Sequence, residues 1–270
     1  GGQLKSIYIS GNAPLYGEAT IQGSKNAALP MMAASLLHRG VSVLKTCPRI
    51  ADVFCMEKIL QALGAATWWE DHDLYMDCTN ADKEEIPEMY TGRMRSSVIL
   101  LGAMLARNGK GKLGYPGGCV IGSRPIDLLI RKHITPRLDP IHFRHHVIQK
   151  DQVIQGTAPS GLWGNQILFP KRSVGATQQA ILAAVLAKGN TIIKNSAREP
   201  EILWLCRYLK TMGAQIKGEG TDCIFIEGRD ELGAGCMKIP PDRIVAGTYI
   251  CAAAATRSEI TLENVPEGEL

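Results

Sequence analysis

The residue best placed to do chemistry in this sequence is a cysteine in a glycine-rich stretch. Residues 112–127 read Lys-Leu-Gly-Tyr-Pro-Gly-Gly-Cys-Val-Ile-Gly-Ser-Arg-Pro-Ile-Asp, which puts Cys119 directly after two glycines. Glycines permit positive backbone dihedral angles and leave no side-chain bulk to cover the thiol. Pro116 fixes the backbone at the entry to a turn. We therefore expect an exposed loop with the thiol at its tip.

The charge around Cys119 is expected to be positive, because Lys112 precedes the loop and Arg124 follows it. A cation beside a thiol favours the thiolate, which makes the sulfur a usable nucleophile or acid at neutral pH. The competing interpretation is that Cys119 is a small apolar core residue, as many free cysteines are. A Gly-Gly loop between basic residues favours the functional interpretation.

A candidate anion site lies at the start of a predicted helix. Residues 23–30 read Gly-Ser-Lys-Asn-Ala-Ala-Leu-Pro, and the helix is expected to continue to Leu37. Ser24 can cap this helix. Lys25 and Asn26 then lie in the first turn, where free N–H groups and the helix dipole attract an anion. A lysine is unfavourable there for the helix itself, so we expect a phosphate or carboxylate site rather than an ordinary solvated lysine.

Composition restricts the classes of protein to consider. A chain of 270 residues with 45% apolar and 21% charged residues is ordinary for a soluble globular protein of one or two domains. The net charge of +4 without a Lys/Arg run gives no reason to expect a nucleic-acid partner, but it is compatible with small anionic ligands. The longest apolar run, 249–255, is far too short to span a membrane, and the first residues contain no apolar signal segment.

Cysteine usage points to a reducing compartment. The eight cysteines are spread widely and contain no CxxC pair. This pattern argues against a zinc site and against a disulfide framework, so we expect a cytoplasmic protein without a metal.

The elements that must position these residues recur along the chain. Gly40 and Gly189 are 149 positions apart, and so are Gly64 and Gly213. Both pairs mark the same order of helix, glycine turn, strand, helix, Leu/Met-Gly-Ala turn and strand, which indicates repeated α/β units. We expect these glycines to be helix C-caps. Two short strands, 6–10 and 17–22, are predicted before the first unit.

Further copies of the unit begin near 93 and 242. The first should contain a helix to Ala106, a turn at 109–111 and a strand that runs into the Cys119 loop; the second should contain an Ala-rich helix and a strand at 259–263. Three complete units and part of a fourth are therefore expected.

Segment 131–146 breaks the pattern, because two prolines and no glycine turn disfavour a full helix. It holds four of the six histidines, but without a cysteine or carboxylate cluster a polar surface segment is favoured over a metal site.

Five motifs, taken in order, resemble one known family, the UDP-N-acetylglucosamine enolpyruvyl transferases, also called 1-carboxyvinyltransferases. The resemblance covers nearly the whole chain except about 131–166, and the set is highly specific although no single motif would be. The motifs are Gly-Ser-Lys-Asn-Ala-Ala-Leu-Pro at 23–30, Arg-Met-Arg-Ser at 93–96, Pro-Gly-Gly-Cys-Val-Ile-Gly-Ser-Arg-Pro-Ile-Asp-Leu at 116–128, Lys-Arg-Ser-Val-Gly-Ala-Thr at 171–177 and Ala-Arg-Glu-Pro-Glu at 197–201.

The resemblance implies an α/β (α+β) fold of inside-out α/β barrels, each built from three repeated βαβαββ-like units, with the active site between two such domains. By the family pattern, residues 24–239 form one complete domain that carries the cysteine loop. Residues 1–23 and 240–270 are parts of an incomplete second domain. The family's general-base aspartate and later arginines would lie in the missing units, so we expect little or no turnover from these 270 residues alone.

The resemblance also implies a reaction. The enolpyruvyl group of phosphoenolpyruvate is transferred to the 3′-hydroxyl of UDP-N-acetylglucosamine, and phosphate is released through a tetrahedral ketal without a cofactor. This is the first committed step of peptidoglycan synthesis. Cys119 matches the reactive cysteine, which protonates the enol carbon or forms an adduct and is the site of alkylation by fosfomycin. Lys25 is the second implied catalytic residue.

The implied substrate-binding residues fall into three groups. Lys25 and Asn26 match the phosphoenolpyruvate contacts. Arg95 and Arg124 match residues that bind phosphate or the nucleotide sugar. The uridine-diphosphate and sugar contacts match Arg124, Pro125, Ile126, Asp127, Leu128, Lys171, Arg172, Ser173 and Val174.

Two alternatives stay open. The first is the sister enzyme that acts on shikimate 3-phosphate, which the Pro-Gly-Gly-Cys loop and the Lys-Arg-Ser-Val-Gly stretch argue against. The second is a truncated or non-catalytic paralogue that binds a UDP-sugar without chemistry. The anomalous 131–146 segment and the chain end at Leu270 favour it, and Arg172 replaces a usually apolar residue.

Overall fold

The structure is a computed structural model, and it describes residues 8, 13–92, 94–114, 146–148 and 151–270. Contacts divide the chain into a larger unit, Gly23–Pro240, and a smaller unit made of Gly1–Gln22 and Pro241–Leu270. That these units are a complete and an incomplete domain of the family stays a prediction.

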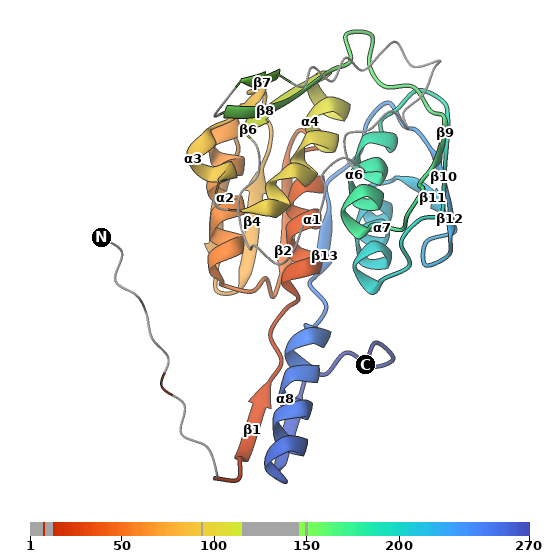
Figure 1. The fold of residues 1–270 in the computed structure, drawn as a ribbon. Helices are drawn as coiled ribbons and strands as arrows, with labels where there is room; N and C mark the ends of the chain where they lie inside the picture. The colour runs from red at the N-terminus through yellow and green to blue at the C-terminus, as the bar shows by residue number, and fades with distance from the viewer. Residues whose placement is uncertain (1–7, 9–12, 93, 115–145, 149–150) are drawn as a thin grey trace. The chain divides into compact units, whose positions relative to one another are not determined.

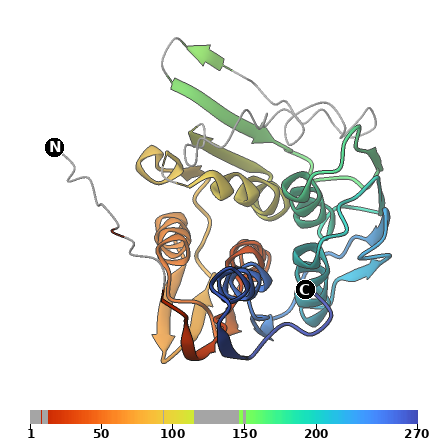
Figure 2. The same cartoon turned by 60° about the horizontal axis from the view of Figure 1, so that its bottom comes forward.

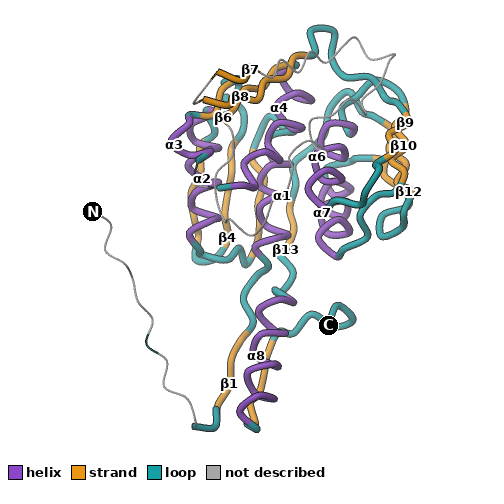
Figure 3. The backbone as a smooth tube through the Cα atoms, viewed as in Figure 1, coloured by secondary structure: helices purple, strands orange, loops and turns teal. Residues whose placement is uncertain are grey.

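The larger unit is a mixed α/β structure in which helices are interspersed with groups of short strands (Figures 1 and 3). Its helices are α1 (Lys25–Ser35), α2 (Ala51–Leu63), α3 (Glu88–Thr91), η1 (Arg95–Ile99, a 3₁₀ helix), α4 (Leu100–Asn108), α6 (Val174–Ala184) and α7 (Pro200–Thr211). Its strands are β2 (Val41–Lys45), β3 (Ala66–Glu70), β4 (Asp73–Asp77), β5 (Glu85–Ile86), β6 (Lys110–Gly114), β7 (His146–Ile148), β8 (Asp151–Thr157), β9 (Gln166–Leu168), β10 (Asn190–Lys194), β11 (Gln215–Lys217), β12 (Cys223–Glu227) and β13 (Cys236–Lys238).

Three four-stranded sheets are formed, with the orders β13-β2-β4-β3, β5-β6-β8-β7 and β11-β12-β10-β9. Each has three antiparallel strands from one repeat and one parallel strand that the chain supplies on leaving the preceding repeat. Thus β5 pairs with β6, β9 pairs with β10, and β13 returns to pair with β2 of the first repeat. The three repeats are therefore joined cyclically, which explains how helices α1, α4, α6 and α7 come to lie inside the ring of sheets (Figure 2).

The predicted repeat is confirmed at the level of register. Helices α1 and α6 start 149 positions apart and have 11 residues each, and β2 and β10 are related by the same offset. The parallel strand pairs have the same register in the first and third repeats. Cys236 lies opposite Val43 and Gln166 lies opposite Ile192, and Val43 and Ile192 are again 149 positions apart.

The inner helices pack closely because small residues line their contacts. Residues 27–35 of α1 are all buried, which is the pattern of a helix covered on every side. Helix α4 meets α6 at Gly102, where a Cβ atom would lie 2.5 Å from the carbonyl oxygen of Gln179. A side chain at this position would push the two helices apart.

The C-cap prediction is correct only in part. Gly64 is the C-cap of α2 in the left-handed conformation, with φ of 110°, and Gly213 follows the end of α7 with φ of 97°. The prediction is wrong for Gly40 and Gly189. Helices α1 and α6 end earlier, at caps in the right-handed conformation, and these two glycines instead lead into β2 and β10.

Other predicted elements need correction. The helix expected to run from 93 to Ala106 begins as the 3₁₀ helix η1 and continues as α4, and the expected turn at 109–111 is shorter because β6 starts at Lys110. After each Leu/Met-Gly-Ala turn one strand was expected, around 73–77 and at 223–227, and these strands are β4 and β12. Their hairpin partners β3 and β11 were not predicted. The predicted strand at 6–10 falls almost entirely outside the described residues, as does the anomalous segment 131–146.

Side chains at the ends of the inner helices tie each repeat to the preceding one. Arg107 of α4 donates hydrogen bonds to the carbonyl oxygens of Leu36 and Cys78 in the first repeat, both at 2.6 Å. His38 Nδ1 lies 2.8 Å from the carbonyl oxygen of Leu232, where the third repeat ends. Lys188 of the third repeat donates to a carbonyl oxygen at the end of the second, at 3.3 Å.

The smaller unit consists of β1 (Tyr16–Thr20), α8 (Arg243–Thr256) and β14 (Glu259–Glu263). Strand β1 pairs with β14 in parallel, with Tyr16 opposite Glu259. Asp242 caps α8 by accepting hydrogen bonds from the backbone N–H groups of Ile244 and Val245. The predicted Ala-rich helix and the strand after it are confirmed.

Candidate substrate site

The first turn of α1 presents the predicted anion-binding residues. Ser24 accepts a hydrogen bond from the N–H group of Ala27 at 3.4 Å and so caps the helix, as expected. Lys25 is the first residue of α1 and is half-buried, while Asn26 is exposed. The backbone N–H groups of this turn have no carbonyl partner within the helix, which makes the turn suitable for a phosphate or carboxylate.

Lys25 has a partner that the sequence analysis missed. Its ammonium nitrogen lies 2.9 Å from a carboxylate oxygen of Asp52, which sits in the first turn of α2. Asp52 was not among the predicted site residues. The two residues are 27 positions apart on different helices, so no local pattern could have linked them.

The start of α6 holds the second predicted group. Ser173 caps α6 by accepting a hydrogen bond from the N–H group of Ala176 at 3.3 Å, and Val174 is the first residue of the helix. Lys171 and Arg172 precede it and are exposed. Thr177 accepts a hydrogen bond from the N–H group of Ala197 at 3.0 Å, which ties this helix start to the motif 197–201.

Arg95 is the first residue of η1, and η1 contacts both α1 and α6. The helix starts of all three repeats lie at the same end of the unit. In each repeat the helix leads into an inner strand of a sheet, and α1, η1 and α6 begin 16, 15 and 16 positions before β2, β6 and β10. The structure therefore gathers Lys25, Asn26, the backbone of Arg95, Ser173 and Val174 at one end of the larger unit.

Other predicted site residues lie outside the described residues. They are Cys119, Arg124, Pro125, Ile126, Asp127 and Leu128. Their approach to Lys25 stays a prediction.

One contribution to the expected positive charge near Cys119 needs revision. Lys112 lies in β6 and forms an ion pair with Glu85 of the neighbouring strand β5, with an N–O distance of 2.8 Å. A carboxylate this close offsets most of the field of the ammonium group. Lys112 is therefore a weak source of positive charge for the loop.

Three of the described cysteines are unsuited to nucleophilic chemistry. Burial raises the pKa of the Cys47 thiol and of the Cys206 thiol to about 12, and that of the Cys78 thiol to about 11. These thiols stay neutral at physiological pH, so a reactive thiolate must come from another cysteine.

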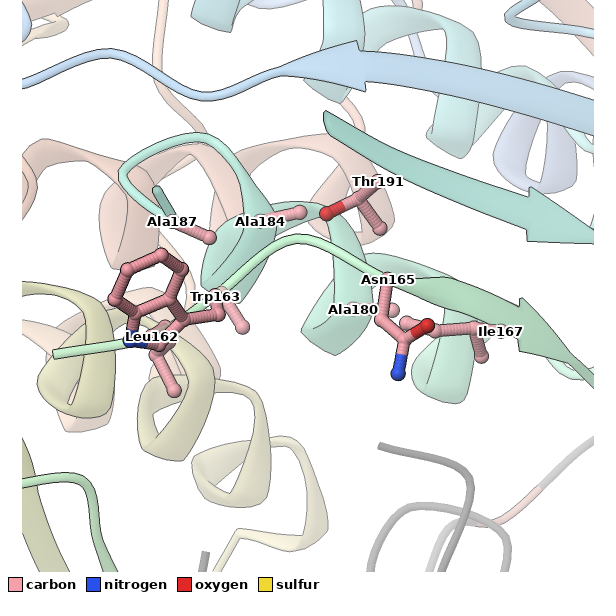
Figure 4. Close-up of a pocket in the computed structure, with 9 residues that line it drawn as sticks. Leu162, Trp163, Asn165, Ile167, Ala180, Ala184, Ala187 and Thr191 are labelled. Atoms are coloured by element: carbon pink, nitrogen blue, oxygen red, sulfur yellow. The ribbon is translucent and has the colours of Figure 1, made fainter. Parts of the chain in front are cut away.

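A small cavity lies elsewhere in the larger unit, beside α6 (Figure 4). It has a volume of about 30 Å³ and is walled mainly by alanine methyl groups of α6, Leu162 and Ile167, with the half-exposed Trp163 at its rim. It has room for about one water molecule and cannot hold a nucleotide sugar.

No metal site and no membrane segment is found within the residues that the structure describes. These residues contain no group of three or more histidine, cysteine, aspartate or glutamate side chains able to hold a metal ion. No helix in the same residues is both long enough and apolar enough to cross a membrane.

The cyclic arrangement of three α/β repeats is shared with solved enolpyruvyl transferases. The enolpyruvyl transferase NikO from Streptomyces tendae matches with a TM-score of 0.75 and 23% identity, over 90% of this chain and 56% of that protein. The EPSP synthase from Acinetobacter baumannii matches with a TM-score of 0.68 and 19% identity, over 94% of this chain and 57% of that protein. These likenesses establish an enolpyruvyl-transferase fold and confirm the predicted fold class.

A family assignment follows from sequence. Residues 9–270 match the family model described as EPSP synthase (3-phosphoshikimate 1-carboxyvinyltransferase), and the chain belongs to that family.

Curated relatives within this family carry a narrower name. UDP-N-acetylglucosamine 1-carboxyvinyltransferase 2 of Caldanaerobacter subterraneus subsp. tengcongensis is 43% identical over 94% of this chain and 59% of its own length. UDP-N-acetylglucosamine 1-carboxyvinyltransferase 1 of Symbiobacterium thermophilum is 41% identical over 95% of this chain and 58% of its own length. The chain thus spans somewhat less than two thirds of the length of these relatives, and the resemblance stated from its motifs is confirmed.

Proposed function

We propose that the protein transfers the enolpyruvyl group of phosphoenolpyruvate to the 3′-hydroxyl of UDP-N-acetylglucosamine and releases phosphate. This reaction would serve peptidoglycan synthesis, and with it cell shape and division, in the cytoplasm. The observation that carries the proposal is the 43% identity, over 94% of this chain, to a protein named for this reaction. The capped helix starts beside Lys25 and Ser173 are the structural feature that fits two anionic substrates.

The reaction proceeds by addition and then elimination. The 3′-oxygen of the sugar bonds to C2 of phosphoenolpyruvate while a proton is added to C3, which gives a tetrahedral ketal. The bond from C2 to the phosphate oxygen then breaks, C3 loses a proton, and the enol ether and phosphate are the products. Cys119 is assigned the role of the acid that protonates C3, which requires a group able to give up a proton near neutral pH.

Positive charge must balance the phosphate and carboxylate of phosphoenolpyruvate throughout. We assign this role to Lys25 at the start of α1, together with Arg95 and Arg124. Charge-assisted hydrogen bonds from such groups are roughly twice as strong as neutral ones and stabilise charge that develops on the leaving phosphate. Asn26, exposed in the same turn, is assigned a contact with the same substrate.

The uridine diphosphate and sugar are assigned to the start of α6, with Lys171, Arg172, Ser173 and Val174, and to the stretch from Arg124 to Leu128. Exposed cations directly before a capped helix start suit a diphosphate. The general base for the sugar hydroxyl is not assigned to any residue of this chain.

The deciding experiment compares the two acceptors by titration calorimetry. We expect UDP-N-acetylglucosamine to bind and shikimate 3-phosphate not to compete with it. Binding of shikimate 3-phosphate alone would instead support the reaction for which the family model is named.

A second measurement separates an enzyme from a protein that only binds the sugar nucleotide. After incubation with fosfomycin and UDP-N-acetylglucosamine, mass spectrometry should find one adduct on Cys119. The adduct should be absent from Cys119→Ser and present in Cys223→Ser, a control at an exposed cysteine. Binding of the nucleotide sugar without this adduct would contradict the catalytic role of Cys119.

A further inference from the structure

The ion pair between Lys25 and Asp52 is open to solvent and joins the first turns of two helices. The nitrogen and oxygen atoms are 2.9 Å apart, and each side chain is 44% exposed. The two charges have opposite effects on the stability of their helices. A carboxylate in the first turn of α2 is favourable, whereas an ammonium group in the first turn of α1 is unfavourable. The fold alone therefore gives no reason to place a lysine there.

The third repeat provides an internal control for this conclusion. Positions 149 residues after Lys25 and Asp52 are Val174 and Glu201, the first residue of α6 and the second residue of α7. Helix α6 has the same length as α1 and is capped by a serine in the same way, although it begins with valine. A helix start of this architecture thus forms without a lysine, so the pair in the first repeat is not required by the fold.

We propose that Asp52 is a positioning residue that competes with phosphate for the Lys25 ammonium group. When no anion is bound, the Asp52 carboxylate holds the ammonium group at the start of α1. Its negative charge lowers the affinity of this site for phosphate, which allows the released phosphate to leave. The proposal rests on the proposed function, in which Lys25 binds the phosphate of phosphoenolpyruvate. Because both side chains are half-exposed, the carboxylate can turn into solvent when an anion takes its place.

The test is a titration of inorganic phosphate, followed by calorimetry, into the 270-residue chain and its variants. Asp52→Asn removes the charge with little change of shape, and it should tighten phosphate binding on the order of fivefold, the factor that one like charge about 4 Å away is worth in water. Asp52→Glu keeps the charge and should leave the affinity within about twofold of the unsubstituted chain, since the competing carboxylate remains.

A matched control is available in the third repeat. Arg198 and Asp222 form an ion pair of 3.0 Å with side chains 47% and 59% exposed, so Asp222→Asn removes a comparable carboxylate whose partner is not Lys25. It should leave phosphate affinity unchanged. The gain from Asp52→Asn should shrink in 1 M salt, because charges are screened within about 3 Å there, whereas a purely structural effect would not depend on salt in this way.

Each outcome supports or overturns the proposal. Unchanged or weaker phosphate binding by Asp52→Asn would overturn it, as would an equal gain in Asp222→Asn. Lys25→Met separates this proposal from the proposed function, because phosphate binding that survives this change would remove Lys25 from the substrate site. If Lys25→Met abolishes binding while Asp52→Asn has no effect, the assignment of Lys25 stands and the role of Asp52 is refuted. Absence of phosphate binding by the unsubstituted chain and by Asp52→Asn alike would refute both.

Discussion

Replacing Arg107 with methionine is expected to lower the free energy of unfolding by about 3 to 5 kcal/mol. The side chain of Arg107 is only 4% exposed, and its guanidinium group bridges two repeats of the larger unit. Its two short hydrogen bonds, both of 2.6 Å, end on the carbonyl oxygens of Leu36 and Cys78. Leu36 and Cys78 are themselves buried, so water cannot replace the lost donor without opening the structure.

The magnitude follows from these two bonds. A hydrogen bond to a charged group contributes about 1.5 to 3 kcal/mol, and a buried acceptor that loses its donor adds a desolvation cost. This cost falls mainly on the carbonyl oxygen of Leu36, because that of Cys78 also accepts a hydrogen bond from the N–H group of Ala81 at 3.2 Å. Methionine retains most of the apolar stem, so lost packing adds little. Arg107 also makes longer hydrogen bonds to the carbonyl oxygens of His38 and Thr79, at 3.2 and 3.3 Å. We therefore expect a larger loss of stability than the loss of a single hydrogen bond would cause.

Urea unfolding followed by circular dichroism measures this change, and Arg39→Met is the matched control. Arg39 pairs with Asp82 at 2.9 Å, the same carboxylate that Arg107 approaches, but its side chain is 57% exposed. An exposed ion pair contributes about 1 kcal/mol or less. If Arg107→Met costs no more than Arg39→Met, then Arg107 does not hold the two repeats together, and the reasoning is refuted.

Two further predictions concern buried groups. The hydroxyl of Tyr208 is fully buried and interacts only weakly with the Ser42 side chain, so Tyr208→Phe should leave the free energy of unfolding within about 1 kcal/mol. Tyr208→Ala should cost about 3 to 5 kcal/mol, because it leaves a large cavity. A large loss of stability in Tyr208→Phe, measured by urea unfolding, would show instead that the hydroxyl makes a strong hydrogen bond. Burial raises the pKa of Cys47 and Cys206 from 9.0 to about 12 and that of Cys78 to about 11. The folded state thus holds these protons longer than the unfolded state, and stability present below pH 9 should fall as pH rises towards 12, by about 1 kcal/mol per thiol between pH 8 and pH 10. Urea midpoints at the two pH values test this, and Cys47→Ala should reduce the slope.

Local signals were sufficient for much of the fold. Ser24 was positioned at a helix start by its hydrogen-bonding side chain, and Gly64 at a helix end by its tolerance of positive φ. The repeat was visible because three of its four marker glycines, Gly64, Gly189 and Gly213, adopt positive φ, and such positions recur at a constant spacing. These signals depend on a few neighbouring residues, so they can be read without the rest of the chain.

Strands β3 and β11 escaped prediction for a local reason as well. In β3 the adjacent residues Trp68 and Trp69 interrupt the alternation of apolar and polar side chains, because Trp68 points outward and stacks on Tyr75 with ring centroids 5.2 Å apart. Strand β11 has only three residues. Neither stretch carries the pattern by which a half-buried strand is recognised.

The parallel strands β5, β9 and β13 could not be predicted for a different reason. Each has two or three residues and gains its stability from a strand in another repeat. The partnership of Lys25 with Asp52 is hidden in the same way, because it is created only when two helices are packed side by side. Sequence patterns report the residues that a local conformation needs, and they are silent on pairs that only the assembled fold brings together.

The repeats allow fold and function to be separated within a single chain. Ser24 and Ser173 occupy equivalent positions and perform the same capping, so the architecture requires a capping residue there. Lys25 and Val174 are also equivalent, yet they differ in charge, so the architecture does not determine this position and a ligand is the remaining reason for a cation. The same comparison applies to the ties between repeats, where Arg107, His38 and Lys188 differ in type but all reach a carbonyl oxygen of the preceding repeat. The fold therefore requires a hydrogen bond between neighbouring repeats at this place. Substitution of Arg107 should affect stability rather than phosphate affinity.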